Sequence, residues 1–446
     1  MPPRPKIGAR RLSLALGMAL ALAGPAGAQI GGVLPGRLPT PALPPVAVRT
    51  PDPAPVLETG RGLTRRALTT ARQLRLDALV RDHPDLIERD RAGAPVVRGE
   101  VLAISPTRES LARLEAAGFG VKRRAALEPL GLDLVVLTAP PDLAGPAALD
   151  QARKLDPGGD YDLNHIYSEA GAGGARAPSS SRGATQAARI GMIDSGFDPR
   201  HPALAAAHIA QRGFAPGGVT PHGHGLAVAS LLAGAQPPFR GAVPGAALYA
   251  ADVYGSTPAG GSAASLAQAL AWMAEVHAPV VNISLVGPPN RTLEAAVRAL
   301  RARGHLLVAP VGNDGPAASP LYPAAYPGVI AVTAVDGRRR RLPEAGRPPR
   351  VDFAAPGADL AAPAGAGGFV ALRGTSFAAP IVAGRLALRL AAPDPAQAAQ
   401  AVEALSREAQ DLGARGPDPV YGRGLVGADL VVTPRAAAAR GLLTGR

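Results

Sequence analysis

Four short motifs in the second half of the chain contain the residue types that nucleophilic catalysis needs. An apolar run ends at Asp194, and two histidines, His222 and His224, precede another apolar run. Asn313 lies in a Gly-Asn-Asp-Gly segment, and Ser376 follows Gly-Thr. A serine nucleophile needs a general base, a carboxylate that orients the base, and donors for the oxyanion. Together the four motifs supply each of these groups.

The segment from Gly374 to Pro380 is by itself typical of a helix start. It predicts Ser376 as the N-cap, Pro380 in the first turn, and a helix over 377–391. A capping serine needs no chemistry, so the nucleophile hypothesis depends on the other motifs. The same helix start would offer the Ser376 N–H and the positive end of the helix dipole to an oxyanion.

The acid and base candidates each have a structural alternative. Asp194 ends an apolar strand and can orient a histidine, but it can also form a turn. Asp198, four residues on, is the competing carboxylate, although Asp198-Pro199 is more typical of a turn. His222 and His224 stand beside glycines at a helix start, where an exposed imidazole titrates near neutral pH. The pair could instead bind a metal, but no third ligand is close in the sequence.

The motif around Asn313 has two interpretations. Asn and Gly are favoured in tight turns, so Gly312-Asn313-Asp314-Gly315 can simply be a turn after a strand. Alternatively, the Asn313 side-chain amide donates a hydrogen bond to an oxyanion, with the Ser376 N–H as the second donor.

Apolar strands alternate with helices from residue 188 onward, which predicts a parallel sheet covered on both faces. Ligands of such sheets bind at the carboxyl ends of the strands, where Asp194 and Asn313 would lie. The strand candidates are 189–193, 247–253, 280–285, 306–310 and 329–335. The helix candidates are 225–233, 262–275, 292–302, 377–391 and 395–409.

A smaller unit is predicted upstream. Residues 59–90 have a helical pattern, and strands are expected over 96–104, 121–127, 132–138 and 161–167, with helices over 107–118 and 146–155. The order β-α-β-β-α-β suggests a ferredoxin-like α+β unit. It has no clustered catalytic residue types, so its function must depend on its neighbour.

The chain begins with a signal-peptide pattern over 1–28: basic residues, a short apolar run, and Ala-Gly-Ala before Gln29. A Pro-rich linker follows over 29–58, and a Ser-, Gly- and Ala-rich flexible connector is expected over 168–187. Such a connector is a natural site of proteolytic nicking. No later stretch is long and apolar enough for a transmembrane anchor, so we expect an exported protein, periplasmic or extracellular.

Composition limits the possible chemistry and partners. The 446 residues contain no cysteine, which excludes disulfides, Cys-based zinc sites and thiol catalysis. The net charge of +13 comes from arginines, as in a GC-rich genome, and we expect no nucleic-acid partner. The run Arg338-Arg339-Arg340-Arg341 follows a turn signal and has no interleaved aromatics, so we predict a solvated loop.

The four motifs, in the order Asp, His, Asn, Ser, resemble those of the subtilisin-like serine proteases, the subtilases. Asp194-Ser195-Gly196 is similar to the family's Asp motif, and the segment from Gly374 to Pro380 to its Ser block. Alignment of Val228-Ala229-Ser230 with the end of the family's His block makes His224 the catalytic histidine and leaves His222 outside. The resemblance covers roughly 188–433 and leaves 434–446 as a C-terminal tail.

The resemblance implies a doubly wound α/β peptidase domain and an exported endopeptidase that works through an acyl-enzyme. Asp194 would orient His224, His224 would take the Ser376 proton, and Asn313 would bind the oxyanion. Protein or peptide substrates would pair with Ser284-Leu285-Val286-Gly287 and with Gly255-Ser256 as added strands. The S1 pocket is expected near 309–311 and 284–285, with a preference for apolar residues.

The resemblance also makes residues 59–167 a prodomain, a chaperone and inhibitor in cis, whose tail near 162–167 lies in the active site before cleavage. The protein is expected to be monomeric, without a cofactor; calcium is possible by resemblance, but no ligand site is evident. Leu226 and Ala227 depart from the family's His block and imply a differently packed wall. The alternative is an inactive protease-fold protein that binds peptides or a partner.

Overall fold

The computed structural model describes residues 72–170, 188–364 and 368–440. The predicted signal peptide and Pro-rich linker lie outside the described residues, as do residues 171–187 of the predicted connector. Among the described residues, no helix has the length and apolar character that crossing a membrane requires.

A parallel sheet of seven strands forms the centre of the larger domain, in the order β16-β15-β14-β12-β7-β11-β8. Its strands are β7 (Arg189–Asp194), β8 (His208–Gly213), β11 (Ala247–Asp252), β12 (Val280–Ile283), β14 (Leu306–Pro310), β15 (Ile330–Val335) and β16 (Phe353–Pro356). The five inner strands match the predicted ones, and the predicted fold class is confirmed. The two edge strands, β8 and β16, were not predicted.

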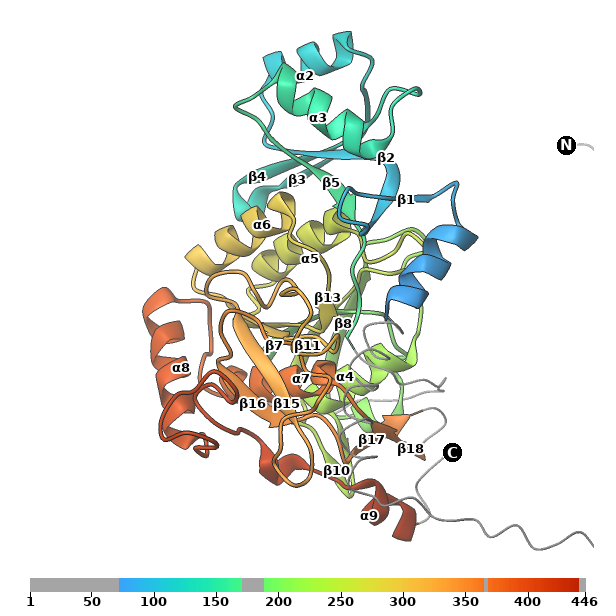
Figure 1. Cartoon of the computed structure of the whole chain (residues 1–446). Helices are drawn as coiled ribbons and strands as arrows, with labels where there is room; N and C mark the ends of the chain where they lie inside the picture. Colours follow the sequence, from blue (N-terminus) through green and yellow to red (C-terminus); the bar gives the residue numbers. More distant parts are fainter. Residues whose placement is uncertain (1–71, 171–187, 365–367, 441–446) are drawn as a thin grey trace, which may run out of the picture. The chain divides into compact units, whose positions relative to one another are not determined.

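Helices cover both faces of this sheet (Figure 1). They are α4 (Gly223–Ala233), α5 (Ala263–Glu275), α6 (Arg291–Ala302), α7 (Thr375–Ala387) and α8 (Pro395–Glu408). The central helices α4 and α7 pack against each other and against the sheet, while α5 packs against α6. Almost every residue of α4 and α7 is buried, which explains their lack of an amphipathic pattern.

The smaller domain has the predicted β-α-β-β-α-β order. Its elements are β2 (Pro95–Ile104), α2 (Arg108–Ala116), β3 (Gly120–Leu127), β4 (Leu132–Thr138), α3 (Gly145–Leu155) and β5 (Asp160–His165). The strands pair antiparallel in the order β5-β2-β4-β3. The helices α2 and α3 and the sheet enclose a core that includes Val101, Leu114 and Leu137.

The prediction of a continuous helical segment over 59–90 was wrong in its second half. Residues 72–82 are helical, but the chain then turns into β1 (Ile87–Arg89), which pairs antiparallel with β2. Leu86-Ile87 precedes charged residues, and Ile87 is fully buried. The arginine-rich helical pattern therefore hid a short strand that tertiary packing stabilises.

Short elements complete the described chain. They are β6 (Ser168–Glu169), β9 (Ala235–Gln236), β10 (Phe239–Arg240), β13 (Leu285–Val286), β17 (Leu360–Ala364), β18 (Gly368–Leu372) and α9 (Pro434–Ala439), with 3-10 turns at Glu128–Leu130, Pro202–Leu204 and Ala428–Leu430. Arg338 to Arg340 form an exposed turn, as predicted, and Asp336 accepts hydrogen bonds from the Arg338 N–H and from the Arg340 side chain. The last residue of the predicted loop, Arg341, is instead half-buried and forms a β-bridge with Val335.

Candidate active site

Asp194 and His224 meet where the end of β7 contacts the start of α4. The His224 Nδ1 atom lies 2.8 Å from Asp194 Oδ1, and both side chains are fully buried. Gly225 allows the start of α4 to approach the end of β7, because a Cβ at this position would lie 2.2 Å from the Ser195 carbonyl oxygen. Asp194 also accepts the Ser195 N–H at 2.7 Å, which fixes the carboxylate against the strand end. Asp194 therefore holds the imidazole at Nδ1, while Nε2 has no hydrogen-bond partner in the described part of the chain.

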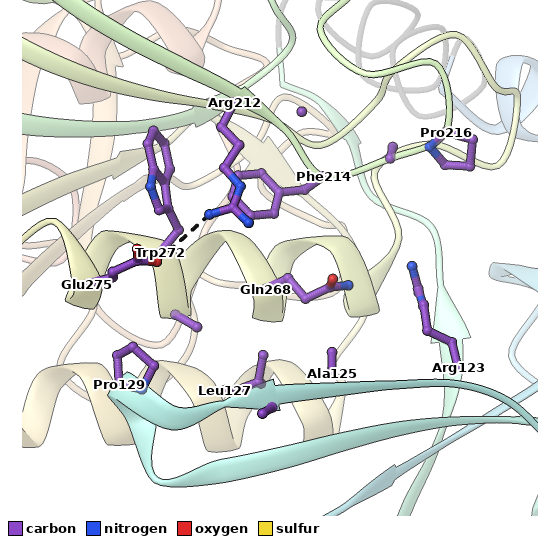
Figure 2. A pocket seen from close by; sticks show the side chains of 14 residues that line it. Arg123, Ala125, Leu127, Pro129, Arg212, Phe214, Pro216, Gln268, Trp272 and Glu275 are labelled. Atoms are coloured by element: carbon purple, nitrogen blue, oxygen red, sulfur yellow. Dashed lines mark ion pairs between the residues drawn. The ribbon is translucent and has the colours of Figure 1, made fainter.

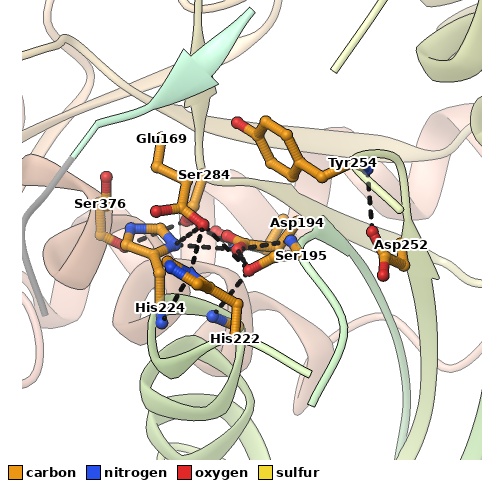
Figure 3. Close-up of polar contacts among 11 residues, drawn as sticks. Glu169, Asp194, Ser195, His222, His224, Asp252, Tyr254, Ser284 and Ser376 are labelled. Carbon is orange, nitrogen blue, oxygen red and sulfur yellow. Dashed lines mark hydrogen bonds and ion pairs between the residues drawn. The ribbon is translucent and has the colours of Figure 1, made fainter. Parts of the chain in front are cut away.

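Ser376 lies in the first turn of α7, with its side chain fully buried. The Phe377 ring is 5.3 Å from the His224 ring, so the helix start borders the imidazole. Figure 3 shows the side chains of Ser376 and His224 in this region. Within the described residues, both His224 Nε2 and Ser376 Oγ are buried without a hydrogen-bond partner. A hydroxyl and an imidazole nitrogen that the fold leaves unpaired are the groups a nucleophile–base pair requires.

Ser376 is not the N-cap, so that prediction was wrong. The N-cap is Gly374, whose φ of 142° favours glycine, and Ser376 is the second residue of the helix. Pro380 lies inside the helix, beyond its first turn. Because Pro380 has no N–H, the Ser376 carbonyl loses its intrahelical donor.

Asn313 follows β14 and faces the start of α7. Its Oδ1 accepts a hydrogen bond from the Thr375 N–H at 3.0 Å. This bond fixes which end of the amide faces the helix, so the Nδ2 donor points away from it. Nδ2 donates to the carbonyl oxygen of Ala170. The candidate oxyanion donor thus holds a peptide carbonyl of this same chain.

The segment that ends at Ala170 runs along the predicted substrate strand. In β6, Glu169 is opposite Leu285 and Ser168 opposite Val286, antiparallel to β13. The Ala170 N–H donates to the Ser284 carbonyl at 3.4 Å, and on the other edge the Tyr167 N–H donates to the Gly261 carbonyl at 2.9 Å. The tail was expected near 162–167, but the residues beside the candidate triad are 168–170.

The tail side chains occupy separate pockets. The Tyr167 ring packs on Gly287, where a Cβ would lie 2.4 Å from the ring, and its hydroxyl donates to the Pro288 carbonyl at 2.8 Å. Ala170 packs with Val286 and Leu321. The expected S1 lining over 309–311 therefore differs from the side chains that Ala170 contacts.

The predicted second substrate segment lies beside the tail only in part. Gly255 lines a cavity of about 360 Å³ next to Ser168 and Glu169. The Ser256 N–H donates to the Pro216 carbonyl. The backbone hydrogen bond to this part of the tail is made instead by the Gly261 carbonyl, which accepts the Tyr167 N–H.

Glu169 brings a second carboxylate to the histidines. Its Oε1 accepts from Ser195 Oγ at 2.9 Å, lies 3.0 Å from His222 Nδ1 and lies 3.8 Å from His224 Nδ1 (Figure 3). Burial opposes the charged form of Glu169, but the charge of His224 and the contacts with His222 and Ser195 lower its pKa.

The two carboxylates change the titration of His224. Burial opposes protonation of the imidazole, but the charges of Asp194 and Glu169 and the Asp194 hydrogen bond raise the pKa of His224 to about 9. Burial raises the pKa of Asp194, with His224 opposing. With the tail in place, the two carboxylates therefore favour the protonated form of His224 at neutral pH.

No sequence signal pointed to the role of Glu169, because Ser168-Glu169-Ala170 matches no motif and the contacts of Glu169 depend on where the tail lies. The family resemblance places His222 outside the site and Ser195 within the Asp motif, whereas in the structure both residues contact Glu169. Glu169, Asp194 and His224 also form a group that could hold a metal ion. The same residues also form hydrogen bonds with one another and with Ser195.

Leu226 and Ala227, the departures in the His block, are buried in the main core. They fill the wall of α4 behind His224. Asp198 accepts from the Arg200 backbone and side chain, so it caps a turn, as its sequence suggested.

A cavity of about 580 Å³ lies away from these groups, between β3 of the small domain and α5 (Figure 2). Arg212, Phe214 and Trp272 line one side, and Arg212 lies over the Phe214 ring at 5.1 Å. None of the candidate triad residues borders this cavity. We therefore attribute the cavity to the way the small domain packs against α5.

The comparisons identify the family. Residues 185–424 match the model of the Subtilase family, Peptidase S8. Subtilisin Savinase of Lederbergia lenta is 35% identical over 247 residues, which are 54% of this chain and 89% of that protein. The alkaline protease of Alkalihalobacillus alcalophilus is 35% identical over 247 residues, 54% of this chain and 63% of that protein.

A solved structure supports the fold. Fervidolysin from Fervidobacterium pennivorans, described as a keratinolytic enzyme related to subtilisin, aligns with a TM-score of 0.63 at 21% identity. The alignment covers 79% of this chain and 62% of fervidolysin. The chain belongs to the subtilase family and is a subtilisin-like serine endopeptidase.

Proposed function

We propose that the protein is an exported serine endopeptidase that hydrolyses peptide bonds through an acyl-enzyme. Ser376 Oγ attacks the carbonyl, and His224 takes its proton and returns it to the leaving amine. Asp194 holds the imidazole and stabilises its charge. The Asn313 amide and the Ser376 N–H bind the oxyanion.

The observation that carries the proposal is the hydrogen bond from Asn313 Nδ2 to the carbonyl of Ala170. Antiparallel pairing with β13 presents this carbonyl as a substrate would be presented. We therefore propose that the peptidase cleaves its own chain after Ala170, within the connector expected over 168–187. The preceding α+β unit is then a prodomain that inhibits in cis.

The helix over 72–82 adds to the proposed inhibition. Arg72 Nη1 donates to Asp314 Oδ2 at 2.7 Å, and Asp314 is the neighbour of Asn313. Leu76 and Leu79 line the cavity that Glu169 and His222 also line. The helix thus covers the cleft beside the tail, and it must leave before another substrate binds.

A serine-directed fluorophosphonate probe tests the activity. We expect the processed protein to be labelled at Ser376, with no labelling of Ser376→Ala and full labelling of Ser406→Ala, a control hydroxyl on α8. Failure of the processed wild type to label would contradict a serine peptidase and favour a binding protein.

The mass of the N-terminus tests processing and export. Expressed in a bacterial host with its leader, the protein should be recovered outside the cytoplasm with Gly171 as its first residue. Ser376→Ala should keep the bond after Ala170 intact in pure form. If that variant still processes itself, cleavage by this site is wrong.

A further inference from the structure

The pocket around Glu169 differs from a simple apolar subsite. We infer that the subsite for the residue before the scissile P1 residue, the S2 subsite, selects an acidic side chain, and that His222 and Ser195 are its specificity-determining residues. The inference rests on the proposed function, in which Ala170 is P1 and Glu169 is P2.

The contacts of Glu169 are those of a recognised carboxylate. One oxygen accepts from the Ser195 hydroxyl at 2.9 Å and lies 3.0 Å from His222 Nδ1. The side chain keeps only 19% of its exposure, so few water molecules can replace these partners. A carboxylate this buried is stable in its charged form only when charge-assisted hydrogen bonds compensate for the lost hydration.

The proton on His222 favours a negative partner. Nδ1 lies 3.0 Å from Glu169 but 3.4 Å from the His224 N–H, which it could accept only when unprotonated. Because the carboxylate is the nearer partner, we place a proton on Nδ1, and the hydrogen bond with Glu169 raises the pKa of His222. The other titratable groups around this pair are His224 on α4, Asp194 at the end of β7, and Tyr254 beyond β11.

The positions of both residues are built into the fold. Ser195 Oγ also accepts the Gly225 N–H at 3.1 Å, so α4 fixes the hydroxyl, whose O–H is directed to Glu169 Oε1 at 2.9 Å and Asp194 Oδ1 at 3.1 Å. His222 is the N-cap residue of α4, and its imidazole is half exposed, open to a side chain that enters from the cleft. Glutamine at P2 would have the same shape as glutamate but no charge for His222.

Competition by product peptides tests the inference. The full chain is expressed and left to process itself, and hydrolysis of the reporter acetyl-Tyr-Ser-Gln-Ala-p-nitroanilide is followed at pH 6.5. The competitors are acetyl-Tyr-Ser-Glu-Ala and acetyl-Tyr-Ser-Gln-Ala. We expect the Glu peptide to inhibit about tenfold more strongly, because its carboxylate gains two charge-assisted contacts.

Two variants separate the subsite from the fold. His222→Asn places a residue type favoured at N-caps at the start of α4 but loses the cation, and should reduce the Glu/Gln ratio to about twofold. His208→Asn, an exposed histidine on β8, should keep the wild-type ratio. Equal inhibition by the two peptides in the wild type, with the reporter still cleaved, would overturn the acidic subsite. A reporter that the processed wild type does not cleave would overturn the proposed function, and this inference with it.

Discussion

The hydroxyl of Ser284 donates a hydrogen bond of 3.0 Å to the carbonyl oxygen of Ser376. That carbonyl is free because Pro380, four residues later in α7, has no N–H to donate. Asn282 Nδ2 in turn donates to Ser284 Oγ at 2.9 Å. These two hydrogen bonds connect the backbone of the candidate nucleophile to the end of β12. The connection is possible because the proline leaves the Ser376 carbonyl without a donor inside the helix.

Ser284→Ala should lower kcat about tenfold, because the Ser376 carbonyl loses its hydrogen-bond donor. The Ser376 hydroxyl is then positioned less precisely relative to His224. Loss of one buried hydrogen bond should also cost about 1 kcal/mol of stability. Peptidase kinetics and thermal unfolding measure the two effects. Ser406→Ala is the matched control, because it also removes a hydroxyl bonded to a helix carbonyl. An unchanged kcat in Ser284→Ala would contradict the positioning role.

Asn313→Asp should reduce kcat by about 10²–10³ with little change in KM, because it removes a donor that acts on the oxyanion. Aspartate keeps the oxygen that accepts the Thr375 N–H, so the loop should fold normally. Steady-state kinetics of the processed protein, with circular dichroism as the folding control, measures the change. A kcat within a few-fold of wild type would mean that Asn313 is not the oxyanion donor.

Self-cleavage in cis should become faster as the pH rises through about 9. While the tail is bound, the charges of Asp194 and Glu169 raise the pKa of His224 to about 9, against the effect of burial. Below that pH the imidazole is protonated and cannot accept the Ser376 proton; above it, the base form is present.

Glu169→Gln removes one of these charges, so the midpoint of the pH–rate profile should move to lower pH and cleavage at pH 7 should become faster. Glu109→Gln, an exposed carboxylate on α2, is the matched control and should leave the midpoint unchanged. Rates of cleavage after Ala170, followed by mass spectrometry between pH 6 and 10, give the profile. A midpoint that stays fixed in Glu169→Gln would exclude Glu169 as the group that keeps His224 protonated.

The sequence predicted the inner strands of the large sheet because each is a short, nearly continuous apolar run. It did not predict β8, whose residues alternate between half-buried and exposed, as an edge strand allows. It predicted Asp194, His224, Asn313 and Ser376 as one site, because the ends of parallel strands meet at one edge.

Other parts depend on tertiary contacts that local sequence does not encode. The cap of α7 falls on Gly374 rather than Ser376, since the backbone there adopts a conformation that favours glycine. Glu169 and the helix over 72–82 reach the cleft only because the small domain packs on α5 and α6. Neither segment has a local sequence pattern that predicts its place in the cleft, because the histidines of the cleft lie more than 50 residues away in the chain.

Arg72→Ala should speed the release of the prodomain after cleavage and so shorten the lag before activity appears. Arg72 is paired with Asp314, and both side chains are mostly buried, with 20% and 11% exposure. Burial raises the pKa of Asp314, and the charge of Arg72 opposes this, so the pair stabilises the closed cleft only while Arg72 is present. A partly exposed pair contributes roughly 1 kcal/mol, which predicts a release about five times faster.

The onset of peptidase activity after a shift to processing conditions measures this release. Arg81→Ala is the matched control, since Arg81 lies on the same helix but pairs with Asp82 in solvent. Arg81→Ala should keep the wild-type lag. If Arg72→Ala also keeps it, while the bond after Ala170 is cut at the normal rate, the helix over 72–82 does not restrain the prodomain, and the tail alone must account for inhibition.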